Sequence, residues 1–234
     1  MKEGIYRRKS IRNYQREQLP DEIIQKIKQK ITELKPLMPN IKYQITINEK
    51  VEGLFKVEAP HYLAFYSEEK PGYLENIGFV GQMLSLFMTS LGLGSCWLGA
   101  AKSVGEESEL PYIACMAFGK AAEELYRQEK DFKRKANDRI SNTTNEIINA
   151  ARLAPSAVNI QDWYFYQEKN CIHCYYQKNN FLTAKLLGSN LSEINLGIAM
   201  CHMILLLENN YEVIEFREPP SVKNSVYFRT IVIK

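Results

Sequence analysis

The sequence predicts a chain of helices and strands that is built from two related halves. Three stretches of letters recur in the same order, and the helices and strands predicted around them recur too. DEIIQKI, from Asp21, is similar to NEIINAA from Asn145; ENIGFVG, from Glu75, is similar to INLGIAM from Ile194; and YIACMAFGK, from Tyr112, is similar to FRTIVIK at the chain's end. Offsets of about 115 to 124 residues indicate a domain-scale duplication and not a solenoid repeat. Chance similarity between amphipathic segments is the alternative.

In the first copy Leu19-Pro20-Asp21 is typical of a helix start. The isoleucines after it recur at helical spacing, so we expect a helix to begin there. Alternating apolar residues predict strands, and a long apolar run before Gly92 predicts a buried helix, since glycine commonly follows a helix. We expect strands over 43–47, 62–66 and 112–118, and the buried helix over 77–91.

The stretch from Glu123 to Arg139 is charged throughout and has no apolar period, which predicts a surface connector. After it we expect a helix capped by Asn142, strands over 163–166 and 172–176, a buried helix over 196–207 and a final strand over 227–233. The predicted boundaries are residues 1–122 for the first half, 123–140 for the connector and 141–234 for the second half.

The composition favours a globular protein and argues against a nucleic-acid-binding or membrane-spanning one. The chain has 234 residues, 45% of them hydrophobic, which suffices for a sizeable core. A net charge of +3 argues against nucleic acid, which needs a dense basic surface, and is compatible with a small anionic ligand. The polar start predicts no targeting signal, and the apolar runs 78–93 and 196–207 are too short for a membrane span. Five cysteines, an odd number, favour reduced thiols and a cytoplasmic location.

The first candidate motif is a cluster of cations around one hydroxyl near the chain start, formed by Arg7, Arg8, Lys9, Ser10 and Arg12. Guanidinium groups present a planar fork of donors that matches phosphate, and serine adds a short donor. The cluster therefore predicts a phosphate clamp. A solvated basic N-terminus is the alternative.

The second candidate motif is Gly92-Leu93-Gly94-Ser95-Cys96-Trp97-Leu98-Gly99, which follows the first buried helix. Glycines let the backbone approach a ligand closely or adopt a positive φ. Backbone N–H groups here could therefore face a flat cofactor. A helix cap followed by a tight turn is the alternative.

The third candidate motif, APSAVNIQDW, runs from Ala154 to Trp163 between a predicted helix and a predicted strand. Its small residues allow close packing against a ring. Asn159 and Gln161 supply amide donors and acceptors for the edge of a heterocycle. An ordinary helix-to-strand loop is the alternative.

Together the three segments resemble the nitroreductase family. They are similar to its RRSIR-type phosphate segment, its GLGSCWIG segment beside the isoalloxazine and its PSxxNxQPW segment. The resemblance covers most of the chain, and it implies an α+β fold, with a mixed sheet flanked by helices, FMN as the cofactor and an active site at a subunit interface. Asp162 stands where the family often has proline, and we expect it to tune access to the ring.

The order of the segments departs from that of the family. The Pro-Ser segment follows the glycine segment here, and residues 35–42, where the first copy should carry it, lack the pattern. In the family one subunit supplies the phosphate and glycine segments, and its partner supplies the Pro-Ser segment. The resemblance therefore implies two pseudo-symmetric halves that form a pseudo-dimer in one chain, with one FMN between them and a mirror-related site without cofactor. A monomer could be complete, although a dimer is not forbidden.

Carried over by position, the resemblance assigns cofactor binding to Arg7, Arg8, Lys9, Ser10, Arg12, Trp97, Leu98, Gly99, Pro155, Ser156, Ala157, Asn159 and Gln161. Arg12 falls toward the pyrimidine side of the flavin, and Leu98 and Gly99 fall near N5 and O4. Lys133 and Arg134 are loose counterparts of the basic residues that hold the phosphate near the family's C-terminus. A solvated charge run is the alternative for that segment.

The implied activity is that of an FMN-dependent oxidoreductase working by a ping-pong cycle. NADH or NADPH passes a hydride to the flavin, and a nitro compound, quinone or similar small acceptor then takes it. The cycle needs no side-chain nucleophile, and Arg12 would stabilise negative charge at the N1/O2 edge. The alternatives are an FMN-binding module with little turnover, for sensing or storage, and another flavin chemistry on the same fold.

Cys171-Ile172-His173-Cys174 suggests a metal site at first reading. A structural zinc site needs a second pair of ligands, and the sequence has no second CxxC pair. We therefore expect no metal, and we expect His61 and His202 to be core or surface histidines.

Overall fold

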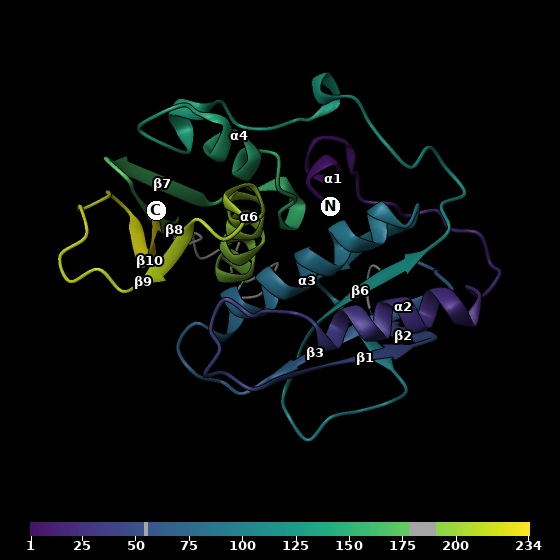
Figure 1. Ribbon diagram of the computed structural model, residues 1–234. Helices are drawn as coiled ribbons and strands as arrows, with labels where there is room; N and C mark the ends of the chain where they lie inside the picture. The colour runs from purple at the N-terminus through teal and green to yellow at the C-terminus, as the bar shows by residue number, and fades with distance from the viewer. Residues whose placement is uncertain (54–55, 178–190) are drawn as a thin grey trace.

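The computed structural model describes residues 1–53, 56–177 and 191–234. Two long helices, α3 (Tyr73–Ser90) and α6 (Leu191–Leu207), cross at the centre, and each packs against the sheet of its own half (Figure 1). Both helices are buried nearly all round, as expected of helices that are apolar on every side. Within the described ranges, no helix has the length and hydropathy of a membrane span.

The first half contains a four-stranded sheet in the order β1-β3-β6-β4, with every neighbouring pair antiparallel. β2 and β5 form a separate two-stranded ribbon. Besides α3, the elements of this half are α1 (Lys2–Arg7), α2 (Asp21–Thr32), β1 (Tyr43–Asn48), β2 (Lys50–Gly53), β3 (His61–Ser67), β4 (Gly94–Leu98), β5 (Ala101–Val104) and β6 (Tyr112–Gly119).

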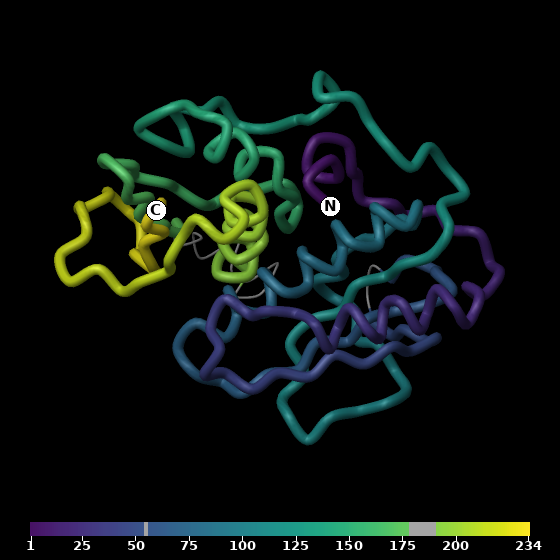
Figure 2. The backbone as a smooth tube through the Cα atoms, in the orientation of Figure 1, coloured from purple at the N-terminus to yellow at the C-terminus, as the bar shows by residue number. Residues whose placement is uncertain are grey.

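The second half contains a sheet in the order β7-β8-β10-β9, again antiparallel throughout. Besides α6, its elements are α4 (Glu146–Arg152), the short helix η3 (Ala157–Asn159), β7 (Trp163–Glu168), β8 (Cys171–Gln177), β9 (Tyr211–Ile214) and β10 (Ser225–Ile233). A connector with the short helices η1 (Glu129–Asp131) and η2 (Asn137–Arg139) runs over both halves (Figure 2). The strand orders correspond, β1 with β7, β3 with β8, β6 with β10 and β4 with β9.

The correspondence extends to individual hydrogen bonds. In the first half the side-chain oxygen Oδ1 of Asn76 accepts from the backbone N–H of Met38, at 2.9 Å. In the second half Oδ1 of Asn195 accepts from the backbone N–H of Ala157, also at 2.9 Å. The spacing from Met38 to Ala157 equals that from Asn76 to Asn195. The same contact is thus repeated in two pseudo-symmetric halves, and the predicted duplication is confirmed.

The predicted helices and strands are confirmed with shifted ends, but one cap is wrong. Oδ1 of Asn145, not Asn142, caps α4 by accepting from the backbone N–H of Ile148 at 2.9 Å. Asn142 instead exchanges hydrogen bonds with the backbone of Gln167 in β7. A neighbouring strand thus takes the side chain that local sequence alone would give to the helix.

The connector lies mostly on the surface, as predicted, but it also has a buried side chain. The side chain of Phe132 is buried, and the guanidinium of Arg127 lies 3.5 Å from the centre of its ring. Arg127 also donates from its backbone N–H to the carbonyl of Arg7 at 2.9 Å and from Nε to the carbonyl of Arg8 at 3.0 Å. One buried ring and a few hydrogen bonds hold this segment in place. It therefore stays ordered without the regular spacing of apolar residues that marks a packed helix or strand.

Candidate functional site

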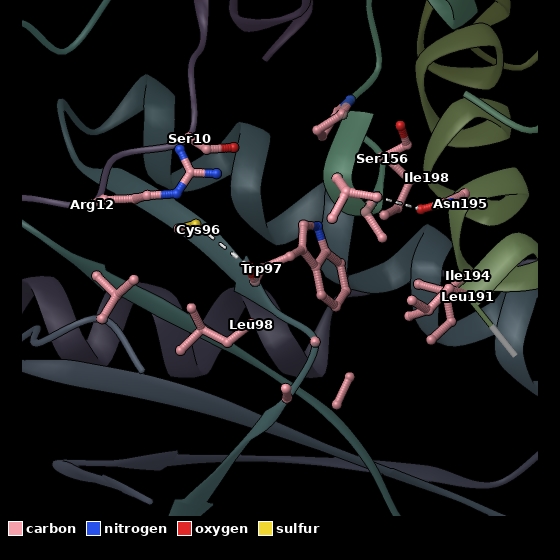
Figure 3. Close-up of a pocket in the computed structure, with 17 residues that line it drawn as sticks. Ser10, Arg12, Cys96, Trp97, Leu98, Ser156, Leu191, Ile194, Asn195 and Ile198 are labelled. Atoms are coloured by element: carbon pink, nitrogen blue, oxygen red, sulfur yellow. Dashed lines mark hydrogen bonds between the residues drawn. The ribbon is translucent and has the colours of Figure 1, made fainter. Parts of the chain in front are cut away.

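A cavity of about 690 Å³ lies between the two halves and is lined by both (Figure 3). The first half contributes Ser10, Arg12, Val57, Cys96, Trp97, Leu98, Gly99, Ala100 and Ala114. The second half contributes Pro155, Ser156, Ala157, Val158, Leu191, Ile194, Asn195 and Ile198. The fold therefore brings together the three segments that the sequence singled out, although they lie far apart along the chain.

The N-terminal segment (residues 7–12) leaves helix α1 at Arg7 and brings two of its side chains to the cavity. Ser10, whose backbone forms a parallel bridge to Ser95 in β4, lines the cavity with Arg12. Arg7 pairs instead with Glu3 and stacks over the ring of Tyr126, and Lys9 forms a 3.1 Å ion pair with Glu123. Arg7 and Lys9 are thus not brought to the cavity.

Three guanidinium groups, here called the arginine cluster (Arg8, Arg127 and Arg134), lie near one another behind the cavity lining, of which none of the three is a part. Arg8 is 2% exposed, and its Nη2 donates to the hydroxyl of Ser10 at 3.3 Å. Burial, and then the charge of Arg127, lowers the pKa of Arg8 to about 10. Burial and the charges of Arg127 and Arg8 likewise lower the pKa of Arg134 to about 9. The three groups are therefore close enough to repel one another.

The arginine cluster has no ion-pair partner in the described part of the chain, although the opposite charge of Asp131 acts on Arg127. Among the described residues, no carboxylate forms an ion pair with any of its members, and Nε and Nη1 of Arg8 and Nε of Arg134 are buried without a hydrogen-bond partner. Buried cations without a partner are costly, by several kcal/mol each in order of magnitude. Such an arrangement is typical of a site for an anion.

The glycine segment begins with the cap that was the alternative, because Gly92 ends α3 with a φ of 75°, but it continues as a strand, β4, from Gly94. It brings Trp97 into the cavity wall, and Figure 3 shows the indole between the N-terminal segment and Ser156. The indole stacks on Phe65 with ring centres 5.1 Å apart, and a Cβ atom on Gly81 would collide with it. Glycine at position 81 of α3 therefore makes room for this tryptophan.

A buried chain of polar groups supports Trp97 from behind. Its indole Nε1 donates to Gln82 at 3.4 Å, and the Gln82 amide lies 2.8 Å from Nε2 of His202. Nδ1 of His202 lies 2.9 Å from the carbonyl oxygen of Ala150, so Nδ1 carries the proton and donates it. Burial lowers the pKa of His202 to about 3, which keeps the ring neutral and confirms a core histidine.

The Pro-Ser loop (residues 155–161) forms the opposite wall of the cavity. Pro155, Ser156 and Ala157 line it, whereas Asn159 and Gln161 do not. Oδ1 of Asn159 accepts from Nη1 of Arg134 at 2.7 Å, and Oε1 of Gln161 accepts from the backbone N–H of Lys135 at 2.7 Å. These two amides therefore bind the connector, not the space in the cavity.

The backbone of the Pro-Ser loop is strained. Val158, Asn159 and Gln161 have φ values of 45°, 60° and 51°, in the left-handed region. A β-branched residue there is a genuine outlier, and strain of this kind concentrates at functional sites. Val158 is also 70% exposed while it lines the cavity, so the loop presents an apolar side chain at the cavity mouth.

Asp162 anchors the Pro-Ser loop, whereas we expected it to tune access to a ring. The residue is buried, and its carboxylate accepts from the hydroxyl of Ser192 at 2.6 Å and from Nδ2 of Asn195 at 2.8 Å. Asn195 in turn accepts from Ala157, so Asp162 fixes the loop through α6. Lys133 is exposed and reaches the loop by its backbone carbonyl, which accepts from Asn159 at 2.9 Å.

Several cavity residues were not predicted. Leu191, Ile194, Asn195 and Ile198 lie on one face of α6, in a run that reads simply as a buried helix. Asn195 could have been found, because it repeats Asn76 in the duplicated letters. Arg127 carried no such signal, since its role depends on contacts made across the fold.

At the mirror-related position two apolar side chains lie against Gly72. Gly72 precedes α3 at the point that corresponds to Leu191 in α6. A Cβ atom on Gly72 would lie 3.2 Å from the ring of Phe228 and 3.4 Å from Cγ of Met38, which stands where the Pro-Ser loop has Ala157. Two large apolar side chains thus pack at one point of the mirror-related position.

Comparisons with known proteins agree with this architecture. A crystal structure from Thermotoga maritima, described as a "putative nitroreductase", covers 99% of this chain and 93% of its own with a TM-score of 0.68 and 19% identity, which shows a shared fold. An FMN-dependent nitroreductase from Clostridium difficile R20291 is 18% identical, with a TM-score of 0.44, over 55% of this chain and 94% of its own. No curated protein matches the sequence.

The family to which this chain belongs is shown by a match to a family model. The model described as "Putative TM nitroreductase" matches residues 1–206, which is most of the chain, including all three candidate motifs and the cavity. With the duplicated nitroreductase-like fold, this match shows that the chain belongs to that nitroreductase family.

Proposed function

We propose that this chain binds one FMN in the cavity between its halves and works as an FMN-dependent NAD(P)H oxidoreductase. The observation that carries the proposal is the arginine cluster, in which Arg8 contacts Ser10 and buried donors of Arg8 and Arg134 have no hydrogen-bond partner. The volume of about 690 Å³ lies within the range of cofactor sites in proteins.

The residues present suit both ends of FMN. Arg8, Arg127 and Arg134, with the hydroxyl of Ser10, would hold the phosphate, because charged donors bind a dianion strongly once it leaves water. Between Trp97 and the small residues of the Pro-Ser loop, the largely apolar cavity would take a flat ring. Arg12, whose guanidinium lies beside Ser10 in Figure 3, would face an edge of that ring.

When bound, FMN supplies the two-electron chemistry, accepting a hydride from NADH or NADPH and delivering it to a nitro compound, quinone or similar acceptor in a ping-pong cycle. The chain's own part is to bind, orient and exclude water. Arg12 places positive charge where reduction puts negative charge, which lowers the barrier electrostatically. The strained backbone at Val158 holds an apolar side chain at the mouth, where it limits access of water.

The same proposal covers location and assembly. All five cysteines are free thiols, which suits the reducing cytoplasm that we propose as the compartment. Because both walls of the cavity belong to one chain, a monomer would complete the site, and neither nucleic acid nor a membrane takes part in the proposed reaction.

Steady-state oxidation of NADH and of NADPH by the FMN-loaded protein, with a quinone or a nitroaromatic as acceptor, tests the proposal. We expect acceptor-dependent oxidation and parallel lines in double-reciprocal plots, since donor and acceptor use one cavity in turn. A protein that holds FMN but oxidises neither nucleotide with any acceptor would be a binding module, and the proposed activity would be wrong.

A further inference from the structure

The side chain of Asn159 points away from the cavity and toward the connector. Its Oδ1 accepts from Nη1 of Arg134 at 2.7 Å, and its Nδ2 donates to the backbone carbonyl of Lys133 at 2.9 Å. Both polar ends of the amide are therefore engaged by the connector. The sequence-based expectation that this amide reads the edge of a heterocycle does not match its position.

The hydrogen bonds of Arg134 leave one particular edge of its guanidinium free. Nη1 uses its two hydrogens on Asn159 and on the carbonyl of Lys133, at 2.7 and 3.1 Å. Nη2 uses one hydrogen on the carbonyl of Leu153, at 3.1 Å. What remains is the Nε–H, buried without a partner, and the second hydrogen of Nη2. Nε and Nη2 share one edge of the guanidinium, and an edge of this kind can bind two phosphate oxygens.

We propose that Asn159 is a positioning residue that holds Arg134 with this edge free for the phosphate of FMN. The assignment rests on the proposed function. Asn159 then acts on the phosphate end of the cofactor through Arg134 and makes no contact with the ring. Its left-handed backbone, with φ of 60°, turns the amide toward the connector.

The other contacts of the Pro-Ser loop do not depend on the Asn159 side chain. Nε2 of Gln161 donates to the backbone carbonyl of Asn159 at 2.9 Å, and the hydroxyl of Ser156 accepts from the backbone N–H of Gln161 at 2.9 Å. Glycine adopts a left-handed φ without strain, whereas alanine does not. Asn159→Gly therefore removes the amide and leaves the loop conformation accessible.

The test is the affinity of flavin-free protein for FMN and for riboflavin, which has the same ring and no phosphate. We expect Asn159→Gly to raise the Kd for FMN roughly tenfold, the effect of losing one hydrogen bond to a charged group. The Kd for riboflavin should change by less than about twofold, since no contact to the ring is lost. Asn159→Gly should add little in an Arg134→Met background, because the residue acts through Arg134.

Asn142→Gly is the matched control, since the Asn142 amide also makes two hydrogen bonds, both to the backbone of Gln167, and lies outside the cavity lining. It should leave both flavin affinities unchanged. Equal weakening of FMN and riboflavin by Asn159→Gly would show contact with the ring and overturn the assignment, and so would an unchanged affinity for FMN. A wild-type chain that binds neither flavin would contradict the proposed function itself, and the assignment with it.

Discussion

Gly78 and Gly197 hold equivalent positions in the two halves, and each lies against the backbone of the opposite helix where α3 and α6 cross. A Cβ atom on Gly78 would collide with the carbonyl group of Ile194, and one on Gly197 with that of Glu75. Glu75 and Ile194 are equivalent too, so the contact is reciprocal, as it is across the twofold axis of a homodimer. The duplicated chain keeps a dimer interface inside one molecule.

Replacing either glycine should separate the halves. Gly78→Ala and Gly197→Ala each place a methyl group against the main chain of a buried helix, which cannot yield as a side chain can. We expect each to destabilise the fold by about 3 kcal/mol or more, measured by urea unfolding. Gly99→Ala is the control, because a Cβ there meets nothing within 4 Å. Equal stability of all three variants would contradict the close crossing.

Glu75 should make stability depend on pH. It is 4% exposed, and burial, with the charge of the neighbouring Glu193, raises its pKa from 4.5 to about 7. The folded protein thus holds this proton more tightly than the unfolded chain, so stability falls as pH rises from 4.5 through about 7. Glu75→Gln stays neutral and should be more stable than wild type by up to about 3 kcal/mol near pH 8, with no such gain near pH 4.

Urea unfolding of wild type and Glu75→Gln at the two pH values measures this difference directly. Comparing the variants at each pH removes the contribution of every other titrating group. A difference that is the same at both pH values would show that Glu75 has an ordinary pKa.

The arginine cluster should lower the stability of the flavin-free protein and strengthen its binding of FMN. Arg8→Met removes a buried cation from a like-charged group and leaves an apolar chain in its place, so the flavin-free protein should unfold at a higher temperature. The same change should weaken FMN binding about a hundredfold, because two free donors are lost. Arg16→Met, at an exposed position outside the cavity, is the control. A lower unfolding temperature together with unchanged FMN affinity would refute the anion site.

Arg12 should matter for both binding and rate. Arg12→Ala removes the charge that faces the cavity, and we expect about a tenfold loss of FMN affinity and a lower kcat at saturating FMN. Arg12→Lys, which keeps the charge, should restore part of the rate. Full flavin content and full rate in Arg12→Ala would show that this role is wrong.

Local pattern was enough to predict most of the fold. The helix that begins at Asp21 and the strand that begins at Tyr43 are confirmed, because apolar periodicity directly records which face is buried. The duplication could also be predicted from the sequence. Close contact at the helix crossing requires glycine at 78 and at 197, so the two copies still share these letters. The cavity joins three segments whose residue types already suggested a ligand.

The details that local pattern missed depend on distant partners. Arg127 lies in a charged stretch with no period, and only the folded chain shows that it packs on Phe132 beside Arg8. Asn159 was expected to face a ring because of its neighbours in sequence, yet a left-handed backbone turns it toward Arg134. Backbone conformation of this kind is not encoded in the identity of a single non-glycine residue.

The most direct test of the central claim is the visible absorption spectrum of the purified protein after saturation with FMN, with the ratio of bound FMN to chain. One composite cavity, together with Met38 and Phe228 packed at the mirror-related position, predicts a flavin spectrum and about one FMN per chain. Two FMN per chain would contradict the single site while leaving the family unchanged. A colourless protein that also fails to bind added FMN would contradict the account as a whole.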